Sequence, residues 1–204
     1  MKETLISKAE FVKSSAGMAD APKPDKPEFA FIGRSNVGKS SLINMLCNKK
    51  GLAKVSATPG KTIAINHFNI NDKWYLVDLP GYGYAKRSKS LRTAWESAMT
   101  EYFVNRENLM TVFVLVDSRI PPQASDVELI NFLGESQVPL CVIFTKTDKN
   151  SQHSTIKNIN TFNKKLSESW EELPTTFSTS ATEKTGRNEV LKFIEKSSKL
   201  FVKE

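Results

Sequence analysis

Residues 33–44, GRSNVGKSSLIN, constrain the fold more than any other part of the chain. They follow the apolar run FAFI and contain the spacing G-x-x-x-x-G-K-S, which ends at Ser40. Glycines let the backbone curl so that its N–H groups face phosphate oxygens, and the positive end of the following helix adds to the attraction. Lys39 would reach the β- and γ-phosphates, and Ser40 can ligate Mg²⁺. The motif predicts a nucleotide site but leaves kinases, ATPases and GTPases open.

Apolar runs that alternate with helical patterns predict an α/β fold. MTVFVLVD and PLCVIFTK are almost continuously apolar, which is typical of parallel strands buried on both faces. TIAINHFNI and KWYLVD, with Asn71-Asp72 between them, predict a hairpin. We therefore expect a three-layer, doubly wound fold whose sheet is mostly parallel, with one antiparallel strand.

The predicted elements fall into two groups. The strands cover residues 5–11, 28–32, 62–70, 73–78, 110–117, 139–146 and 175–178, and the helices cover 39–47, 91–106, 124–133, 151–171 and 188–200. The loop SSAGMADAPKPDKP contains three prolines, so we expect residues 1–27 to be a partly ordered N-terminal extension. Residues 28–204 then form the nucleotide-binding (G) domain.

Composition limits the class of protein. A chain of 204 residues with 39% hydrophobic and 25% charged residues suits one globular domain. Its net charge of +7 favours nucleic acid or anionic membranes as partners, but also fits an ordinary basic surface. Cys47 and Cys141 lie in apolar segments without a disulfide or zinc pattern. We see no secretion signal, spanning run or lipidation motif, and expect a cytoplasmic protein without a membrane partner.

Two further motifs follow predicted strands. At the end of KWYLVD stands DLPG, in which Asp78 can hold the magnesium shell and Gly81 can offer its N–H to the γ-phosphate. At the end of PLCVIF stands TKTD, in which the Asp148 carboxylate can accept hydrogen bonds from N1–H and N2–H₂ of guanine. Adenine would present an acceptor at N1 and leave that charge unsatisfied. TKTD therefore selects GTP and GDP.

A third segment follows the last predicted strand. A tight turn at Ser180-Ala181-Thr182 can give backbone N–H donors to guanine O6. The sequence FSTSATEKTG also offers a second register, at Ser178-Thr179. We align residues 180–182 by their distance to Gly186, and the second register stays open.

Taken together, GRSNVGKSSLIN, TPGKT, DLPGYGYA, TKTD and SAT resemble the EngB (YihA/YsxC) family of bacterial GTPases, from about residue 5 to residue 200. DLPGYGYAK is the most specific element. The resemblance implies a Ras-like GTPase core that helps to assemble the large ribosomal subunit and is linked to cell division and septation. It also implies that Thr62 is the switch I threonine, the second protein ligand of the metal. Thr145 departs from the general N-K-x-D motif in a way that the family tolerates.

The residues expected to form the site make three sets. Those for hydrolysis are Lys39, Thr62 and Gly81, and those for magnesium are Ser40, Thr62 and Asp78. Those for the nucleotide are Gly33, Arg34, Ser35, Asn36, Val37, Gly38, Lys39, Ser40, Gly60, Lys61, Thr62, Ile63, Ala64, Asp78, Leu79, Pro80, Gly81, Thr145, Lys146, Thr147, Asp148, Ser180, Ala181 and Thr182.

The rate of hydrolysis depends on two positions. Ras-type GTPases orient the attacking water with a glutamine directly after D-x-x-G, where this chain has Tyr82. We therefore expect hydrolysis that is slow alone and faster on a partner; a GTP-binding module that does not hydrolyse stays open. Asn36 matches an asparagine that binds K⁺ in related GTPases, where K⁺ adds positive charge between the phosphates. Alternatively, Asn36 only shapes the loop.

The segment that follows DLPG suggests a partner. Residues 81–92 contain no acidic residue and carry four basic ones, Lys86, Arg87, Lys89 and Arg92. If GTP orders this segment, its charge can meet ribosomal RNA of the large subunit, and Tyr82 and Tyr84 can stack on unpaired bases. The alternatives are a solvated loop, or a protein-binding switch in cell division without RNA contact. A metabolite kinase is disfavoured because TKTD has no role there, and we expect a monomer.

Overall fold

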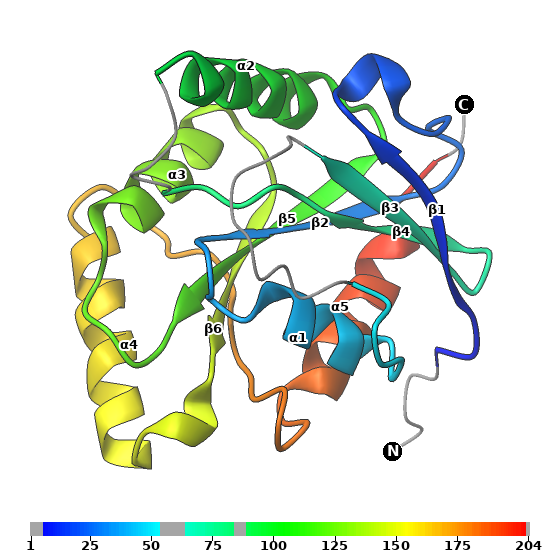
Figure 1. Cartoon of the computed structure of the whole chain (residues 1–204). Helices are drawn as coiled ribbons and strands as arrows, with labels where there is room; N and C mark the ends of the chain where they lie inside the picture. Colours follow the sequence, from blue (N-terminus) through cyan, green and yellow to red (C-terminus); the bar gives the residue numbers. More distant parts are fainter. Residues whose placement is uncertain (1–5, 54–63, 84–88, 203–204) are drawn as a thin grey trace.

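The computed structural model describes residues 6–53, 64–83 and 89–202, in which helices lie on both faces of one mixed sheet (Figure 1). The strands are β1 (Ala9–Ser15), β2 (Glu28–Gly33), β3 (Ile65–Ile70), β4 (Trp74–Asp78), β5 (Leu109–Asp117), β6 (Leu140–Thr145) and β7 (Thr176–Ser178). The helices are α1 (Lys39–Leu46), α2 (Lys89–Asn105), α3 (Ala124–Glu135), α4 (Gln152–Leu166) and α5 (Arg187–Ser198), with 3-10 turns η1 (Met18–Asp20) and η2 (Thr147–Lys149).

The sheet confirms the predicted fold class. Its order is β1-β3-β4-β2-β5-β6-β7, and β3 runs in the direction opposite to all the other described strands. The hairpin of β3 and β4 turns at Asn71 and Asp72, whose φ angles are +53° and +57°. Asparagine and aspartate tolerate this left-handed conformation better than other non-glycine residues, and it matches the twist of a two-residue hairpin turn.

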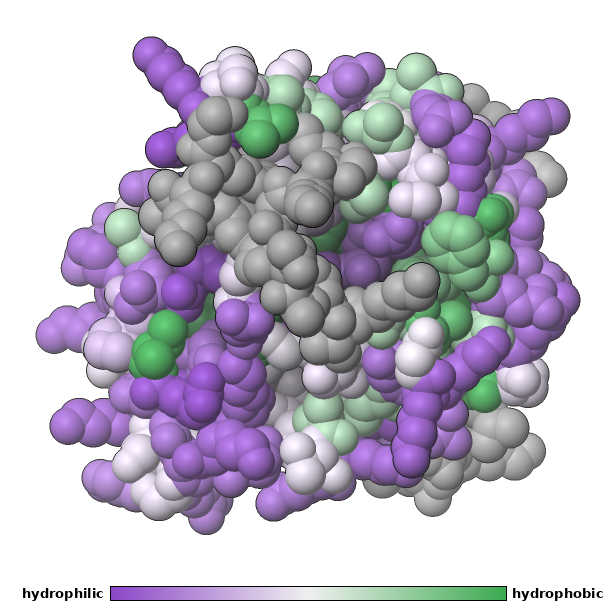
Figure 2. Space-filling model, in the orientation of Figure 1, coloured by the Kyte–Doolittle hydropathy of each residue, from purple (hydrophilic) through white to green (hydrophobic). Residues whose placement is uncertain are grey.

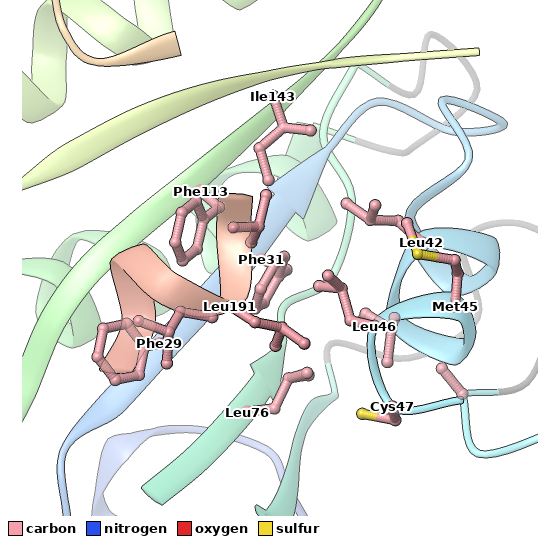
Figure 3. Close-up of a cluster of buried hydrophobic side chains, with 14 of the residues drawn as sticks. Phe29, Phe31, Leu42, Met45, Leu46, Cys47, Leu76, Phe113, Ile143 and Leu191 are labelled. Carbon is pink, nitrogen blue, oxygen red and sulfur yellow. The ribbon is translucent and has the colours of Figure 1, made fainter. Parts of the chain in front are cut away.

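Two hydrophobic cores lie on the two faces of the sheet. Helices α1 and α5 cover one face, whereas α2, α3 and α4 cover the other (Figure 1). In the first core, Phe31 and Phe113 stack with ring centroids 4.8 Å apart, and Leu191 packs against them (Figure 3). Cys47 and Cys141 are buried in the same core, and burial raises the pKa of each thiol to about 12. Both cysteines therefore serve as neutral core residues.

The visible surface in Figure 2 is mostly hydrophilic, and its apolar side chains form small, separate patches. None of the helices within residues 6–53, 64–83 and 89–202 combines the length and apolarity that are needed to cross a bilayer. The buried apolar side chains of these helices pack into the two cores, whereas Leu91, Val104 and Ile156 are exposed.

A buried ionic cluster joins the start of β2 to the end of α2. Glu28 has no exposed surface; Arg106 Nη2 donates to its Oε1 over 2.5 Å, and the Tyr102 hydroxyl donates to its Oε2 over 2.8 Å. His67 Nε2 lies 3.4 Å from Oε1. Burial alone would raise the pKa of Glu28, but His67 and Arg106 outweigh it and lower the pKa to about 2. Arg106 also donates to the carbonyl of Pro22, so the segment before β2 is attached to the same cluster.

Two predicted elements differ from those observed. The first strand runs over Ala9–Ser15 instead of 5–11, because pairing with β3 sets its limits from Ala9 opposite Ile70 to Ser15 opposite Ile65. Helix α4 ends at Leu166 instead of 171. The chain turns there because the Trp170 ring packs against Gly134 of α3. A Cβ on Gly134 would lie only 2.5 Å from that ring, so the close contact requires a glycine.

The sequence of the predicted helix 151–171 places Ile156, Ile159, Phe162 and Leu166 on one apolar face, and this expectation is partly wrong. Phe162 and Leu166 are buried as expected, and Ile159 is half-buried. Ile156, however, is 50% exposed, and Thr155 occupies the buried position beside it. The helix therefore presents a slightly rotated face to the sheet, because only three of the four predicted positions point into the core.

We predict that Glu28→Gln lowers the free energy of unfolding by about 3 kcal/mol at neutral pH, because it leaves Arg106 without its buried counter-ion. The pKa of Glu28 falls from 4.5 to about 2 on folding, so its charge stabilises the fold above pH 4.5. That contribution is lost as the pH falls toward 2, and the two proteins should converge. Urea unfolding at neutral pH and at about pH 3 measures this, with exposed Glu128→Gln as the control. A difference that is independent of pH would contradict the assignment.

Candidate nucleotide-binding site

The phosphate loop connects β2 to α1, as the motif predicts. A Cβ at Gly33 would lie 2.8 Å from Val37 Cγ1, so a larger residue would collide there. Asn36 and Gly38 have φ angles of +61° and +104°, which asparagine and glycine adopt more readily than other residues. Lys39 then begins α1, and the N-terminal end of this helix faces the loop.

The TKTD segment holds the phosphate loop in place. Thr145 Oγ1 lies 2.6 Å from the carbonyl oxygen of Val37, and Thr145 is only 3% exposed. Lys146 Nζ donates to the carbonyl of Asn36 and, over 2.9 Å, to Asp117 Oδ2. The threonine that departs from N-K-x-D therefore has a structural role here, since its hydroxyl reaches the loop.

A cavity of about 200 Å³ lies beside the loop, between the segments that follow β6 and β7. Its lining includes Asp148, Ala181 and Thr182. Asp148 Oδ1 accepts a hydrogen bond from Ser180 Oγ over 2.7 Å, which lowers the pKa of Asp148 and keeps it anionic. Of the second register, Ser178 lies on β7 and does not line this cavity, whereas Thr179 does. Ser180 thus contacts the Asp148 carboxylate directly, and both registers contribute residues to the cavity beside it.

The groups expected at the metal and the γ-phosphate lie on the other side of the loop. Lys39 Nζ contacts Asp78 Oδ1, so the first residue of α1 meets the last residue of β4. Ser40 follows in the first turn of α1. Hydroxyl and carboxylate oxygens are the hard donors that magnesium prefers, so this donor set fits the metal. Residues 60–63, including the expected switch I threonine, lie outside the described residues, and Ala64 is half-buried before β3.

The segment after β4 leads into the second core. The carbonyl of Pro80 accepts a hydrogen bond from Trp95 Nε1 over 3.2 Å. Tyr82 is only 6% exposed, its ring lies 6.4 Å from that of Trp95, and its hydroxyl donates to Asp126 Oδ1 over 2.8 Å. The expectation that Tyr82 stacks on RNA bases is therefore wrong for this arrangement, because the ring is buried. Tyr84 lies outside the described residues.

Only part of the expected basic surface can be located. Of its four residues, Lys89 and Arg92 are described, whereas Lys86 and Arg87 are not. Lys89 and Arg92 are both exposed near the start of α2. Arg92 Nε lies 2.9 Å from Glu96 Oε1, so part of the charge at this end of α2 is balanced within the helix.

Comparison with known proteins identifies the family. The family model described as "50S ribosome-binding GTPase" matches residues 28–146. A probable GTP-binding protein EngB from Christiangramia forsetii is 53% identical over 190 residues, which make up 93% of this chain and 96% of that one. Its counterpart in Bacteroides thetaiotaomicron is 52% identical over 194 residues, covering 95% and 96%. The chain belongs to the EngB family of GTP-binding proteins.

Solved structures agree on the fold. The crystal structure of a probable GTP-binding protein EngB has a TM-score of 0.67 at 24% identity and covers 85% of this chain and 100% of that one. Era, solved with MgGDPNP and nucleotides of 16S ribosomal RNA, has a TM-score of 0.63 at 24% identity, covering 85% and 57%. Membership of the EngB family makes this chain a GTPase, which favours hydrolysis over a module that only binds GTP.

Two buried carboxylates of this EngB family member are not singled out by sequence analysis. Asp117 ends β5 and accepts hydrogen bonds from Arg119 and Lys146, each over 2.9 Å. Burial alone would raise the pKa of Asp117, but these two cations lower it to about 2. An acidic residue at the end of a buried strand is the same signal that identifies Asp78, so Asp117 could have been found. Asp126 has no such signal, because it lies inside a predicted helix.

We predict that Thr145→Val weakens the binding of both GDP and GTP by about tenfold, because Val37 loses the hydrogen bond that fixes the phosphate loop. Titration with fluorescent GDP measures the effect. Thr111→Val is a matched control, since Thr111 is equally buried and its hydroxyl donates to the adjacent carbonyl of Met110 instead of to the phosphate loop. Equal affinities for wild type and Thr145→Val would show that the hydroxyl does not hold the loop.

Proposed function

We propose that this EngB family member is a GTP-dependent switch in the assembly of the large ribosomal subunit, and that normal cell division and septation depend on it. The observation that carries the proposal is the match of residues 28–146 to a family described as 50S ribosome-binding GTPases. The net charge of +7 supports a ribosomal RNA partner. Era, which shares this fold, was solved with a segment of 16S ribosomal RNA. Such a role places the protein in the cytoplasm.

We propose the following division of work within the site. Residues 33–40 hold the phosphates through backbone N–H groups, and Lys39 neutralises the β- and γ-phosphate charge. Asp148 orients guanine, with residues 180–182 beside it. Gly81 offers its N–H to the γ-phosphate. The cavity next to Asp148 and the fixed geometry of the phosphate loop support these assignments.

Magnesium fits the oxygen donors of Ser40 and Asp78, and Thr62, which the family resemblance implies to be the second protein ligand of the metal, is proposed to join them. When bound, the metal neutralises charge that develops on the phosphate oxygens. Lys39 lies close enough to Asp78 to contact it, which supports a shared position for phosphate and metal at this edge of the loop.

Slow intrinsic hydrolysis follows from the surroundings of Tyr82. A phenol lacks the paired donor and acceptor of a glutamine amide, and this hydroxyl already donates to Asp126. The side chain at this position therefore does not orient the attacking water as a glutamine would. We propose that a partner, or K⁺ held near Asn36, supplies the missing stabilisation.

We also propose that residues 1–27 are an extension of the G domain, residues 28–204. The family match begins at residue 28, and β1 is an edge strand that pairs with β3 alone among the described strands. The extension is nevertheless attached, because the Tyr75 hydroxyl lies 3.0 Å from Asp25 and Lys26 Nζ lies 5.0 Å from the centre of the Tyr75 ring.

We predict that replacing Na⁺ with K⁺ speeds GTP hydrolysis several-fold, because K⁺ would add positive charge between the phosphates. Asn36 is exposed in the phosphate loop, where its side chain can reach such an ion. Phosphate release at constant ionic strength measures the rate. Equal rates of GTP hydrolysis in Na⁺ and in K⁺ would contradict the prediction. Asn36 would then only shape the loop.

The partner is tested by co-sedimentation with purified ribosomal subunits. We predict that a non-hydrolysable GTP analogue, and not GDP, carries the protein into the pellet with the large subunit, and that moderate salt weakens the effect. Lys89→Glu should weaken binding, whereas Lys157→Glu, on the distant helix α4, should not. Absence of nucleotide-dependent binding to either subunit would favour a protein partner in cell division.

A further inference from the structure

A groove between α2 and α3 is lined by none of the residues that are assigned to the nucleotide. It is a cavity of about 460 Å³, and both helices lie on the same face of the sheet (Figure 1). Its floor belongs to the second core, because Met99 and Phe103 are at most 4% exposed. Its walls are the half-buried side chains of Trp95, Leu129 and Phe132. The groove therefore combines the volume and the apolar lining that are typical of binding sites.

The shape of the groove indicates an elongated occupant. On α2 the lining follows one stripe at helical spacing, from Arg92 to Phe103 through positions 95, 96, 99 and 100. On α3 a second stripe runs from Ser125 to Phe132 through positions 128 and 129. A helix rises about 1.5 Å per residue, so the stripe on α2 is about 16 Å, or three turns, long. A compact small molecule would fill only part of that length.

The walls also limit the secondary structure of the occupant. Both are helices, in which the backbone N–H and C=O groups bond to each other within the helix. The groove thus offers side chains, but no sheet edge with which an extended strand could pair. A segment that enters it must satisfy its own backbone hydrogen bonds, as a helix does. The geometry favours an amphipathic helix whose apolar face packs against the groove.

The charges around the groove favour a basic occupant. Helix α3 contains three acidic residues and no lysine or arginine, although the whole chain has a net charge of +7. Among the described charged residues of the lining, Arg92 is paired with Glu96 over 2.9 Å, which leaves the exposed carboxylate of Glu128. RNA phosphates would be repelled by this wall. Lysine or arginine side chains beside an apolar face would instead pair with it, and cations also bind favourably over aromatic rings.

We propose that the groove between α2 and α3 binds a basic amphipathic helix of a partner protein. Apolar side chains of that helix fill the groove between Trp95, Leu129 and Phe132, and its lysines or arginines flank Glu128. Tyr82 and Gly83 also line the groove, so the partner touches the segment that follows DLPG. The inference goes beyond the proposed function, because it concerns a protein partner and requires no contact with RNA.

The test uses a fluorescein-labelled model peptide of about 12 residues, which is long enough for three helical turns. Leucines at helical spacing form one face and lysines flank that face; a matched peptide carries glutamates in place of the lysines. Fluorescence polarisation measures the binding of each peptide to the GDP-bound protein at physiological salt. We expect saturable binding of the lysine peptide and about tenfold weaker binding of the glutamate peptide. The net charge of +7 would produce the opposite order, so this result reports the local charge of the groove.

Two variants place the peptide in the groove. Leu129→Ala should weaken binding of the lysine peptide about tenfold, because the peptide loses apolar contact; Val104→Ala, on α2 but outside the lining, is the control. Glu128→Lys should weaken it about fivefold, because attraction becomes repulsion. Glu101→Lys changes the net charge equally at an exposed position outside the lining and should have little effect. Normal GDP binding shows that each variant is folded.

Several results would overturn the proposal. A lysine peptide that does not bind, or that binds no better than the glutamate peptide, would exclude a basic helix as the occupant. Equal affinity of wild type, Leu129→Ala and Glu128→Lys for the lysine peptide would place the binding elsewhere on the surface.

Other occupants give their own signals in the same set of variants. Binding of a uridine oligonucleotide that Leu129→Ala abolishes would assign the groove to RNA. Self-association that Leu129→Ala abolishes, measured by analytical ultracentrifugation without peptide, would assign the groove to a second copy of the chain. Because none of these measurements uses ribosomes, a failure to bind the large subunit would disprove the proposed function without affecting the result for the groove.

Discussion

The geometry of the nucleotide site depends on the attachment of the phosphate loop to the end of β6. The loop contains two left-handed residues and has few side chains of its own to hold its shape, so its carbonyl groups need external donors. Thr145 and Lys146 supply two of them, and Lys146 is in turn fixed by Asp117 at the end of β5. The segment that would recognise the base therefore also shapes the segment that would bind the phosphates.

The sequence predicts the sheet and the site for a physical reason. Parallel strands buried on both faces must be continuously apolar, and the loops at their carboxyl ends must converge, so the segments of Lys39, Asp78 and Asp148 follow β2, β4 and β6 at the same edge of the sheet. The contacts made after those strand ends are less predictable. The burial of Tyr82 depends on Asp126, which is distant in sequence, and Ile156 became exposed through a small rotation of α4 that periodicity does not resolve.

The comparisons and the structure contribute different parts of the functional conclusion. Family membership establishes a GTPase, whereas the likeness to Era shows the shared fold alone. The structure adds that the tyrosine in place of the catalytic glutamine is a buried, hydrogen-bonded residue. That residue contacts the second core. It therefore helps to fix the conformation of the segment after β4, in addition to any effect on the chemistry of the nucleotide site.

The cluster around Glu28 has a mechanical consequence for α2. It holds the last turns of the helix through Tyr102 and Arg106, whereas the first turn, at Lys89, is exposed. Trp95, whose indole donates to the carbonyl of Pro80, connects the first half of α2 to the segment after β4, so a force on that segment acts on the helix away from its anchor. Any displacement of the chain after Gly81 would then appear as a swing of the N-terminal end of α2, largest at Lys89 and Arg92 and close to zero at Arg106.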